Sequence, residues 1–423
     1  MGLIKDRNAE QKMNKTVLLI ATFDTKSAEA LYLKAQIETL GFAVMTMDAG
    51  ILKPSGTEVD VDRATIARRG GTPIETALAA NDKGAAILNM MSGVAVLTRE
   101  LYEQGRFGAV IGIGGAQGTD IATAGMRALP IGVPKFMVST VASGQTPFGP
   151  FVGTRDVTLM HSVADIQGLN FLTRRILKNA AGAVCGMLEQ FCNEDIQPVG
   201  IPVAMSMMGT TTPGSLYCKK KLEDKGFEIV TFHQNGTGGV AMDEMIRSGA
   251  FRAVLDLSLH EVADRFMGGL HGAIRADRLE AAADAGLPQI VVPGGVNYMV
   301  LGPLEGLSED IRSRKLIVHN PNLTLVRLTP DELSQVGKIV ADKLNRSRST
   351  CRVFIPLNGF SYPDREGLPH WEPEGNRAFV ESLKNNLKET IEIKEIDAHI
   401  NDPEFMDHVV ESFLDIMDVK REA

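Results

Sequence analysis

Residues 109–129 read AVIGIGGAQGTDIATAGMRAL, a strand, a glycine-rich turn and the start of a helix that together indicate the fold of the chain. Val110 to Ile113 predict a buried strand, Gly114-Gly115 end it, and a helix is expected from Ile121 after Gly118-Thr119-Asp120. This strand-to-helix corner at Gly114-Gly115 suits a phosphate group. Glycine lets the backbone approach an anion closely, and the first turn of a helix has unpaired N–H groups. A tight turn that binds nothing would give the same pattern. The stretch matches neither the GxGxxG dinucleotide motif nor the P-loop motif.

The residues before this stretch alternate strands and helices. Strands are predicted at residues 16–21 and 42–47, with a helix at 27–40 between them, which is a βαβ unit and therefore indicates a parallel sheet. A further short strand is expected at residues 85–89, followed by a helix at 94–104.

The second half of the chain repeats features of the first. Matching Leu, Tyr, Lys, Glu, Gly, Phe and Thr residues between Leu31 and Thr46 recur at one constant offset between Leu216 and Thr231. We therefore predict an α/β protein of two Rossmann-like domains with largely parallel sheets, consistent with an internal duplication. The first domain is expected to span residues 1–192 and the second residues 193–423.

The composition limits the classes of partner. Hydrophobic residues make up 44% of the 423-residue chain and charged residues 23%, as in ordinary globular proteins. A formal net charge of −8 argues against nucleic acid or an acidic membrane as a general partner. No apolar run is long enough for a bilayer, and the N-terminal residues lack the apolar core of a signal peptide, so a cytoplasmic location is expected.

Ligands of open parallel sheets bind beyond the carboxyl ends of the strands, and polar and glycine-rich segments fall there in both halves. Two glycine-rich corners and one strand-to-helix turn are candidates for holding phosphate. Their residues are Asp24, Thr25 and Lys26, then Gly114, Gly115, Gly118 and Thr119, and finally Gly236, Thr237, Gly238 and Gly239. Simple helix capping by Asp24 or Thr25 is an equally good interpretation of the turn.

His233, Asp256, Glu261 and Asp364 are the candidate catalytic residues, because imidazoles and carboxylates titrate or bind ligands usefully near neutral pH. Taken one at a time, each histidine is better explained by a structural role. The histidines are not closely spaced in the sequence, so no protein-bound metal such as zinc is expected. A Mg²⁺ ion held through phosphate would leave little trace in the sequence.

These motifs together resemble an ATP-binding family of bacteria, fungi and plants, typified by the N-terminal region of the tomato mosaic virus resistance protein. The resemblance covers about residues 16–417. It implies two Rossmann-like domains, ATP binding and homodimerisation. Two departures from the family pattern are Ala116-Gln117, where Ser-Gly is expected, and Asp243, where Glu is expected.

We therefore expect a protein that binds ATP, with Mg²⁺ as a companion ion, or a phosphorylated metabolite. The main hypothesis is a cytoplasmic metabolic enzyme whose site lies in a cleft between the domains. The alternative is a non-catalytic ATP-binding module that regulates or binds another protein.

Overall fold

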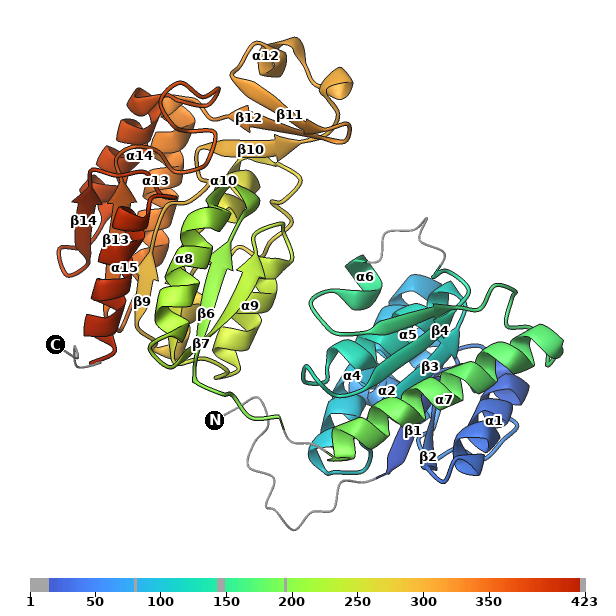
Figure 1. Cartoon of the computed structure of the whole chain (residues 1–423). Helices are drawn as coiled ribbons and strands as arrows, with labels where there is room; N and C mark the ends of the chain where they lie inside the picture. The colour runs from blue at the N-terminus through green and yellow to red at the C-terminus, as the bar shows by residue number, and fades with distance from the viewer. Residues whose placement is uncertain (1–14, 80–81, 143–148, 194–195, 419–423) are drawn as a thin grey trace. The chain divides into compact units, whose positions relative to one another are not determined.

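The computed structural model describes residues 15–79, 82–142, 149–193 and 196–418. The described residues form two compact units that divide between Ile196 and Gln197, here called the first and second domains (Figure 1). Each domain has a parallel sheet of its own, so the predicted class of two Rossmann-like α/β domains is confirmed.

The first domain holds a five-stranded parallel sheet in the order β2-β1-β3-β4-β5. Its elements in chain order are β1 (Thr16–Ala21), α1 (Phe23–Thr39), β2 (Ala43–Asp48), α2 (Arg63–Gly70), α3 (Ile74–Ala79), α4 (Lys83–Glu103), β3 (Ala109–Gly114), α5 (Ala116–Arg127), β4 (Lys135–Ser139), α6 (Gly149–Val152), β5 (Thr158–His161) and α7 (Phe171–Asn193).

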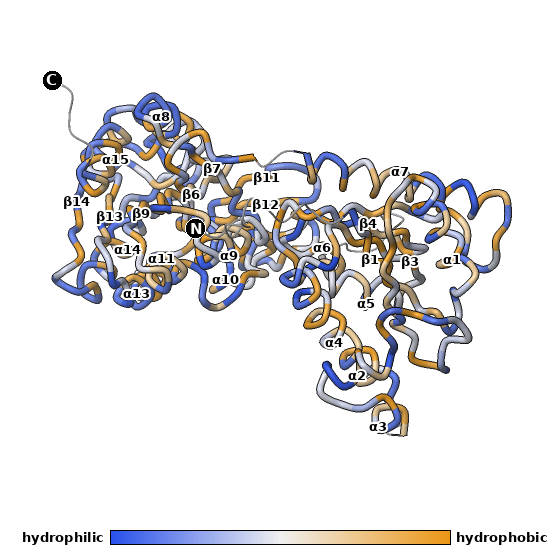
Figure 2. Tube along the Cα trace, turned by 90° about the horizontal axis from the view of Figure 1, so that it is seen from below, coloured by the Kyte–Doolittle hydropathy of each residue, from blue (hydrophilic) through white to orange (hydrophobic). Residues whose placement is uncertain are grey.

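Both faces of this sheet are covered, which explains why its central strands are uninterrupted apolar runs. Side chains from alternate positions of β1 and β3 pack under α1 and α7 on one face. The remaining positions pack under α2, α4 and α5 on the other. Figure 2 shows the hydrophobic colour concentrated along β1, β3 and β4.

The second domain holds a six-stranded parallel sheet in the order β14-β13-β9-β8-β6-β7 and a three-stranded antiparallel sheet in the order β10-β12-β11. Its elements are β6 (Ile201–Met207), a 3₁₀ turn (Gly209–Thr211), α8 (Thr212–Glu223), β7 (Phe227–His233), α9 (Gly238–Arg247), β8 (Ala253–Asp256), α10 (His260–Met267), α11 (Ala281–Ala285), β9 (Gln289–Val291), β10 (Tyr298–Leu301), a second 3₁₀ turn (Leu304–Gly306), α12 (Glu309–Arg312), β11 (Leu316–Asn320), β12 (Leu323–Arg327), α13 (Pro330–Leu344), β13 (Cys351–Pro356), α14 (Pro373–Asn386), β14 (Glu392–Ile396) and α15 (Pro403–Ile416).

Helices α8 and α15 cover one face of the parallel sheet. Helices α9 and α11 cover part of the other face, and α10, α13 and α14 pack with the antiparallel sheet over the remainder (Figure 1).

The two parallel sheets share one topology. Numbered within its own domain, the first sheet has the strand order 2-1-3-4-5, and the second has the same order with one additional strand. The two matched sequence segments fall on equivalent elements, α1 with β2 and α8 with β7. This equivalence agrees with the internal repeat found in the sequence.

Two expectations for the first domain were wrong. Residues 85–89 are not a strand, because Asp82 caps a helix there and α4 runs without interruption from Lys83 to Glu103. A short apolar run does not distinguish a strand from a buried helix segment. Helix α5 begins at Ala116, not at Ile121, so Gly118 and Thr119 lie inside the helix.

Candidate functional site

The corner between β3 and α5 brings backbone segments unusually close together. A methyl group on Gly114 would lie 2.7 Å from Cα of Gly118, so only glycine fits here without movement. Gly115 is the N-cap residue of α5, and no side chain caps the helix. No side chain among the described residues accepts a hydrogen bond from the first-turn amides of α5, which lie at the carboxyl edge of the sheet as an anion site requires.

The side chain of Thr119 is already engaged. Its hydroxyl donates to the carbonyl of Gly115 at 2.7 Å and lies 2.7 Å from the Ser139 hydroxyl. It therefore ties α5 to the end of β4.

The turn between β1 and α1 lies beside this corner, because a methyl group on Gly118 would be 3.9 Å from Thr22. Thr25 is exposed and Lys26 is half-buried, in a non-helical conformation that kinks α1. The buried Asp24 carboxylate accepts the Leu52 amide at 2.8 Å. Asp24 thus holds the loop after β2, whereas Thr25 and Lys26 are accessible.

Arg63, the first residue of α2, is a cation that the sequence analysis did not select. It also lies beyond the carboxyl end of β2, and its charge acts on the buried Asp48. Its Nη1 atom is enclosed and has no hydrogen-bond partner among the described residues. Burial raises the pKa of Asp48, whose carboxylate accepts the amides of Phe23 and Gly50. The only sequence signal for Arg63 was its place in an unusually long polar loop.

The glycine loop of the second domain is filled by a carboxylate of the protein. Oε1 of Glu261 accepts the amides of Gly236 at 2.8 Å and Gly239 at 3.2 Å. A methyl group on Gly239 would overlap Oε2 of Glu261. Of the two residues between them, Thr237 is exposed and Gly238 is half-buried. The Glu261 carboxylate therefore takes the place that a bound phosphate would have at these two amides.

Glu261 belongs to a buried network around Arg278. The guanidinium makes two 2.8 Å hydrogen bonds to Asp256, and Glu261 and Asp243 lie at 3.3 and 3.4 Å. All four side chains are almost wholly inaccessible to solvent. The structure thus brings together two predicted catalytic residues, Asp256 and Glu261, but around a cation that the sequence analysis did not identify.

One guanidinium cannot neutralise three buried carboxylates, so the network favours a bound proton. Burial raises the pKa of Asp243 to about 7, despite the opposing effect of Arg278. Burial also raises the pKa of Glu261. Asp243 has the longest contact to Arg278 and is the natural holder of the proton.

Asp364 belongs to a different buried network. Its Oδ2 accepts the Phe360 amide at 3.0 Å and the Asn376 side chain at 2.8 Å, while its Oδ1 lies 3.9 Å from Arg327. These contacts organise the long loop between β13 and α14. Burial raises the pKa of Asp364.

His233 ends β7 and is exposed, as an acid–base residue needs to be. Its charge acts on two other histidines, His260 and His271. His260 is fully buried, its ring stacks on Tyr298 with centroids 4.7 Å apart, and burial lowers its pKa to about 4. His260 is therefore neutral at neutral pH. Neither His260 nor His271 was selected from the sequence.

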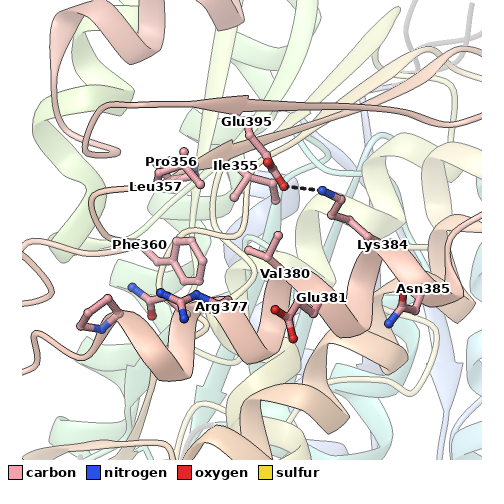
Figure 3. A pocket seen from close by; sticks show the side chains of 12 residues that line it. Ile355, Pro356, Leu357, Phe360, Arg377, Val380, Glu381, Lys384, Asn385 and Glu395 are labelled. Carbon is pink, nitrogen blue, oxygen red and sulfur yellow. Dashed lines mark hydrogen bonds and ion pairs between the residues drawn. The ribbon is translucent and has the colours of Figure 1, made fainter.

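A pocket of about 460 Å³ opens elsewhere in the second domain, between α14 and the ends of β13 and β14 (Figure 3). Lys384 and Glu395 form a 2.8 Å ion pair at its wall. Its lining includes none of the predicted site residues among those the structure describes.

The fold defines a two-domain Rossmann-like α/β protein. In each domain, polar side chains gather beyond the carboxyl ends of the strands of the parallel sheet. The chain belongs to the uncharacterised protein family UPF0261. The N-terminal domain model of that family matches residues 15–193, and the C-terminal domain model matches residues 201–417.

Relatives of known sequence agree with this assignment. A UPF0261 protein of Clostridium tetani is 38% identical over 96% of this chain and 100% of that protein. The tomato ToMV resistance protein Tm-1(GCR237) is 34% identical over 80% of this chain but only 45% of its own length. The expected resemblance is thus confirmed at the level of the family.

Among solved structures, the UDP-N-acetylglucosamine 2-epimerase from Rickettsia bellii covers 95% of each chain at 11% identity, with a TM-score of 0.22. A score this low carries no argument about function. None of the helices among the described residues combines the length and hydrophobicity of a membrane-spanning segment.

Proposed function

We propose that this protein binds ATP or another phosphorylated metabolite at the carboxyl edge of the sheet in its first domain. The observation that carries the proposal is the uncapped N-terminus of α5 at the Gly114-Gly115 corner. Backbone amides would donate hydrogen bonds to the phosphate there, and the positive end of the helix dipole would stabilise its charge. Mg²⁺ as a companion of the nucleotide, and the homodimer expected from the family resemblance, are parts of the same proposal.

The side chains around this corner support an anionic ligand. Thr25 offers an accessible hydroxyl, and Lys26 offers an ammonium group on the adjacent turn. The enclosed Nη1 of Arg63 lacks a hydrogen-bond partner among the described residues, which makes it a third candidate contact. The Asp24 side chain acts through the loop that it holds.

The second domain carries the candidate catalytic residues of the enzyme hypothesis. His233 is the accessible candidate there for proton transfer. Asp256, Glu261 and Asp364 are buried and hydrogen-bonded, which favours positioning roles for them. That burial also favours the second candidate function, a binding or regulatory module without turnover. An enzyme should convert the bound ligand to product, and the His233→Ala variant should not. A module should form no product in either protein.

Isothermal titration tests ligand binding directly. The full-length protein should bind ATP with Mg²⁺, or inorganic phosphate as the minimal probe, at concentrations up to about 1 mM. Lys26→Ala should weaken binding because it removes one cation from the phosphate. No heat from ATP or phosphate with the wild type would refute the proposal, and equal binding by Lys26→Ala would remove that residue from it.

Gly115→Asp should change stability and binding in opposite directions. An aspartate at this N-cap would accept first-turn amides of α5, and a β-region φ of −79° and ψ of −161° suits it, so stability should rise by a few tenths of a kcal/mol. The same carboxylate would fill and repel the anion site, so affinity for ATP should fall at least about 10-fold.

Gly182→Asp is the matched control, because Gly182 is an exposed residue of α7 with open space around it. It adds the same charge to the same domain and should leave affinity unchanged. Calorimetric unfolding measures stability and titration measures binding. Unchanged ATP affinity in Gly115→Asp would place the ligand elsewhere.

A further inference from the structure

Three side chains that bind metals well converge at the carboxyl edge of the sheet in the second domain. His260 and Asp264 lie one turn apart on α10, and His271 follows in the next loop. One ligand atom from each lies within 4.8 Å of the other two. The Nε2 atom of His260 is 3.2 Å from Nδ1 of His271 and 4.0 Å from Oδ1 of Asp264.

The tautomer of His260 is set by its surroundings. Its Nδ1 lies 3.1 Å from the carbonyl oxygen of Gly295, which can only accept a hydrogen bond. Nδ1 therefore carries the proton, and the Nε2 lone pair faces His271. A metal-binding histidine commonly donates its other N–H to a carbonyl in this way. The ring is also held by stacking on Tyr298, whose hydroxyl lies 2.9 Å from that of Thr210.

Asp264 is held equally firmly. Its oxygens accept the amides of Val300 at 2.7 Å and His271 at 2.6 Å. A methyl group on Gly269 would overlap the carboxylate, so the loop closes over Asp264 only because residue 269 is glycine. The Asp264 side chain is fully buried, yet no lysine or arginine forms an ion pair with it among the described residues. A cation is the partner that this carboxylate lacks.

The separations suit a transition metal. Two ligands at 2.0–2.1 Å from a tetrahedral ion lie about 3.3 Å apart. The distance between the two imidazole nitrogens already has this value, the 4.0 Å contact from His260 to Asp264 exceeds it by less than about 1 Å, and the third separation, from His271 to Asp264, is within 4.8 Å. His271 is only half-buried, so a small movement of its ring can complete the geometry.

We propose that His260, Asp264 and His271 bind one divalent transition-metal ion of the kind that prefers imidazole ligands, with Zn²⁺ as its representative. Two imidazoles and one carboxylate leave a coordination position open, as in catalytic metal sites. This site and the phosphate corner use different residues of different domains, so either proposal can fail without the other.

The metal-free alternative is a plain hydrogen bond from Nδ1 of His271 to Nε2 of His260, and zinc binding separates the two. Full-length protein is stripped with a chelator, dialysed, and titrated with Zn²⁺ against a chromophoric competitor. One Zn²⁺ per chain is expected, with a dissociation constant below about 1 μM, and Mg²⁺ should not compete for the site. Absence of stoichiometric binding would overturn the proposal.

His271→Ala is the test variant, because this half-buried side chain can be removed with little risk to folding. Its affinity for Zn²⁺ should fall at least about 100-fold, since one of three protein ligands is lost. His319→Ala removes an exposed imidazole from β11 and should bind as the wild type does. Equal binding by wild type and His271→Ala would refute the assignment.

Two further measurements distinguish binding at this site from misfolding of the variant and from Zn²⁺ binding elsewhere on the surface. Zn²⁺ should raise the unfolding midpoint of the second domain in the wild type and not in His271→Ala, because only a ligand of the folded state stabilises it. Co²⁺ in place of Zn²⁺ should give visible absorption bands that the variant lacks. A midpoint that rises equally in both proteins would assign the ion to another site.

Discussion

Arg278→Met is expected to lower the free energy of unfolding of the second domain by at least about 3–5 kcal/mol. Arg278 is the only side-chain cation in contact with Asp243, Asp256 and Glu261 among the residues the structure describes. Its removal leaves buried carboxylates unpaired, which costs far more than the pair itself contributes. Methionine retains much of the side-chain volume, so the loss would reflect charge and not a cavity.

The loss should be local to the second domain. Trp371, the only tryptophan of the chain, lies in the loop after β13, so its fluorescence reports unfolding of that domain. Arg275→Met is the control, because Arg275 is largely exposed, lies three residues before Arg278, and forms its ion pair among the described residues with Asp277, which is not part of the network. It should change the free energy of unfolding by no more than about 0.5 kcal/mol. Similar losses in the two variants would mean that the buried network is not held by its central cation.

Asp243→Asn should gain stability relative to the wild type as the pH rises from 4 to 7. The folded pKa of Asp243 is raised from 3.8 to about 7, mainly by burial. Over this window the unfolded chain releases the proton while the folded chain keeps it. The stabilising contribution of the protonated carboxyl is therefore complete below pH 4 and is lost as the pH rises through 7.

Asparagine does not titrate, so the difference between variant and wild type should grow by up to about 1.4 kcal/mol for each pH unit in that window. Asp277→Asn is the control, and its difference in stability from the wild type should stay constant in that window. The hydrogen bond from Arg275 lowers the pKa of Asp277, so its stabilisation is present above pH 4 and is lost only below it. Denaturant unfolding followed by Trp371 fluorescence between pH 4 and 8 measures both variants. A flat difference for Asp243→Asn would show that the network holds no proton there.

The succession of elements was largely predictable because it is local in the sequence. The buried strands β1 and β3 are branched apolar runs ended by polar or glycine residues, and the repeated segment identified equivalent elements in the two domains. The failure at residues 85–89 came from the same kind of signal, since Ala, Ile and Leu in a short run suit a helix as well as a strand. The antiparallel sheet was not predicted, because pairing between distant strands leaves no local pattern.

The candidate site was predictable as a location but not as a set of contacts. Asp24, Gly114 and Glu261 all lie at or just beyond the carboxyl ends of parallel strands, where a strand leads into the next helix. Their individual chemistry depends on partners far away in the sequence. Glu261 binds the amides that appeared to form a phosphate loop, and His260 faces His271 across a loop whose course the sequence does not reveal.

The amino-acid sequence by itself determined the α/β class, the two related domains and the glycine corner before α5, because these depend on side-chain periodicity and on backbone space within a few residues. Only the tertiary structure decided which carboxylates are neutralised by Arg278 and which imidazoles meet at Asp264. Hydrogen bonds, burial and proton affinity arise from groups contributed by several elements at once, and the positions of those elements are set by packing of the whole domain.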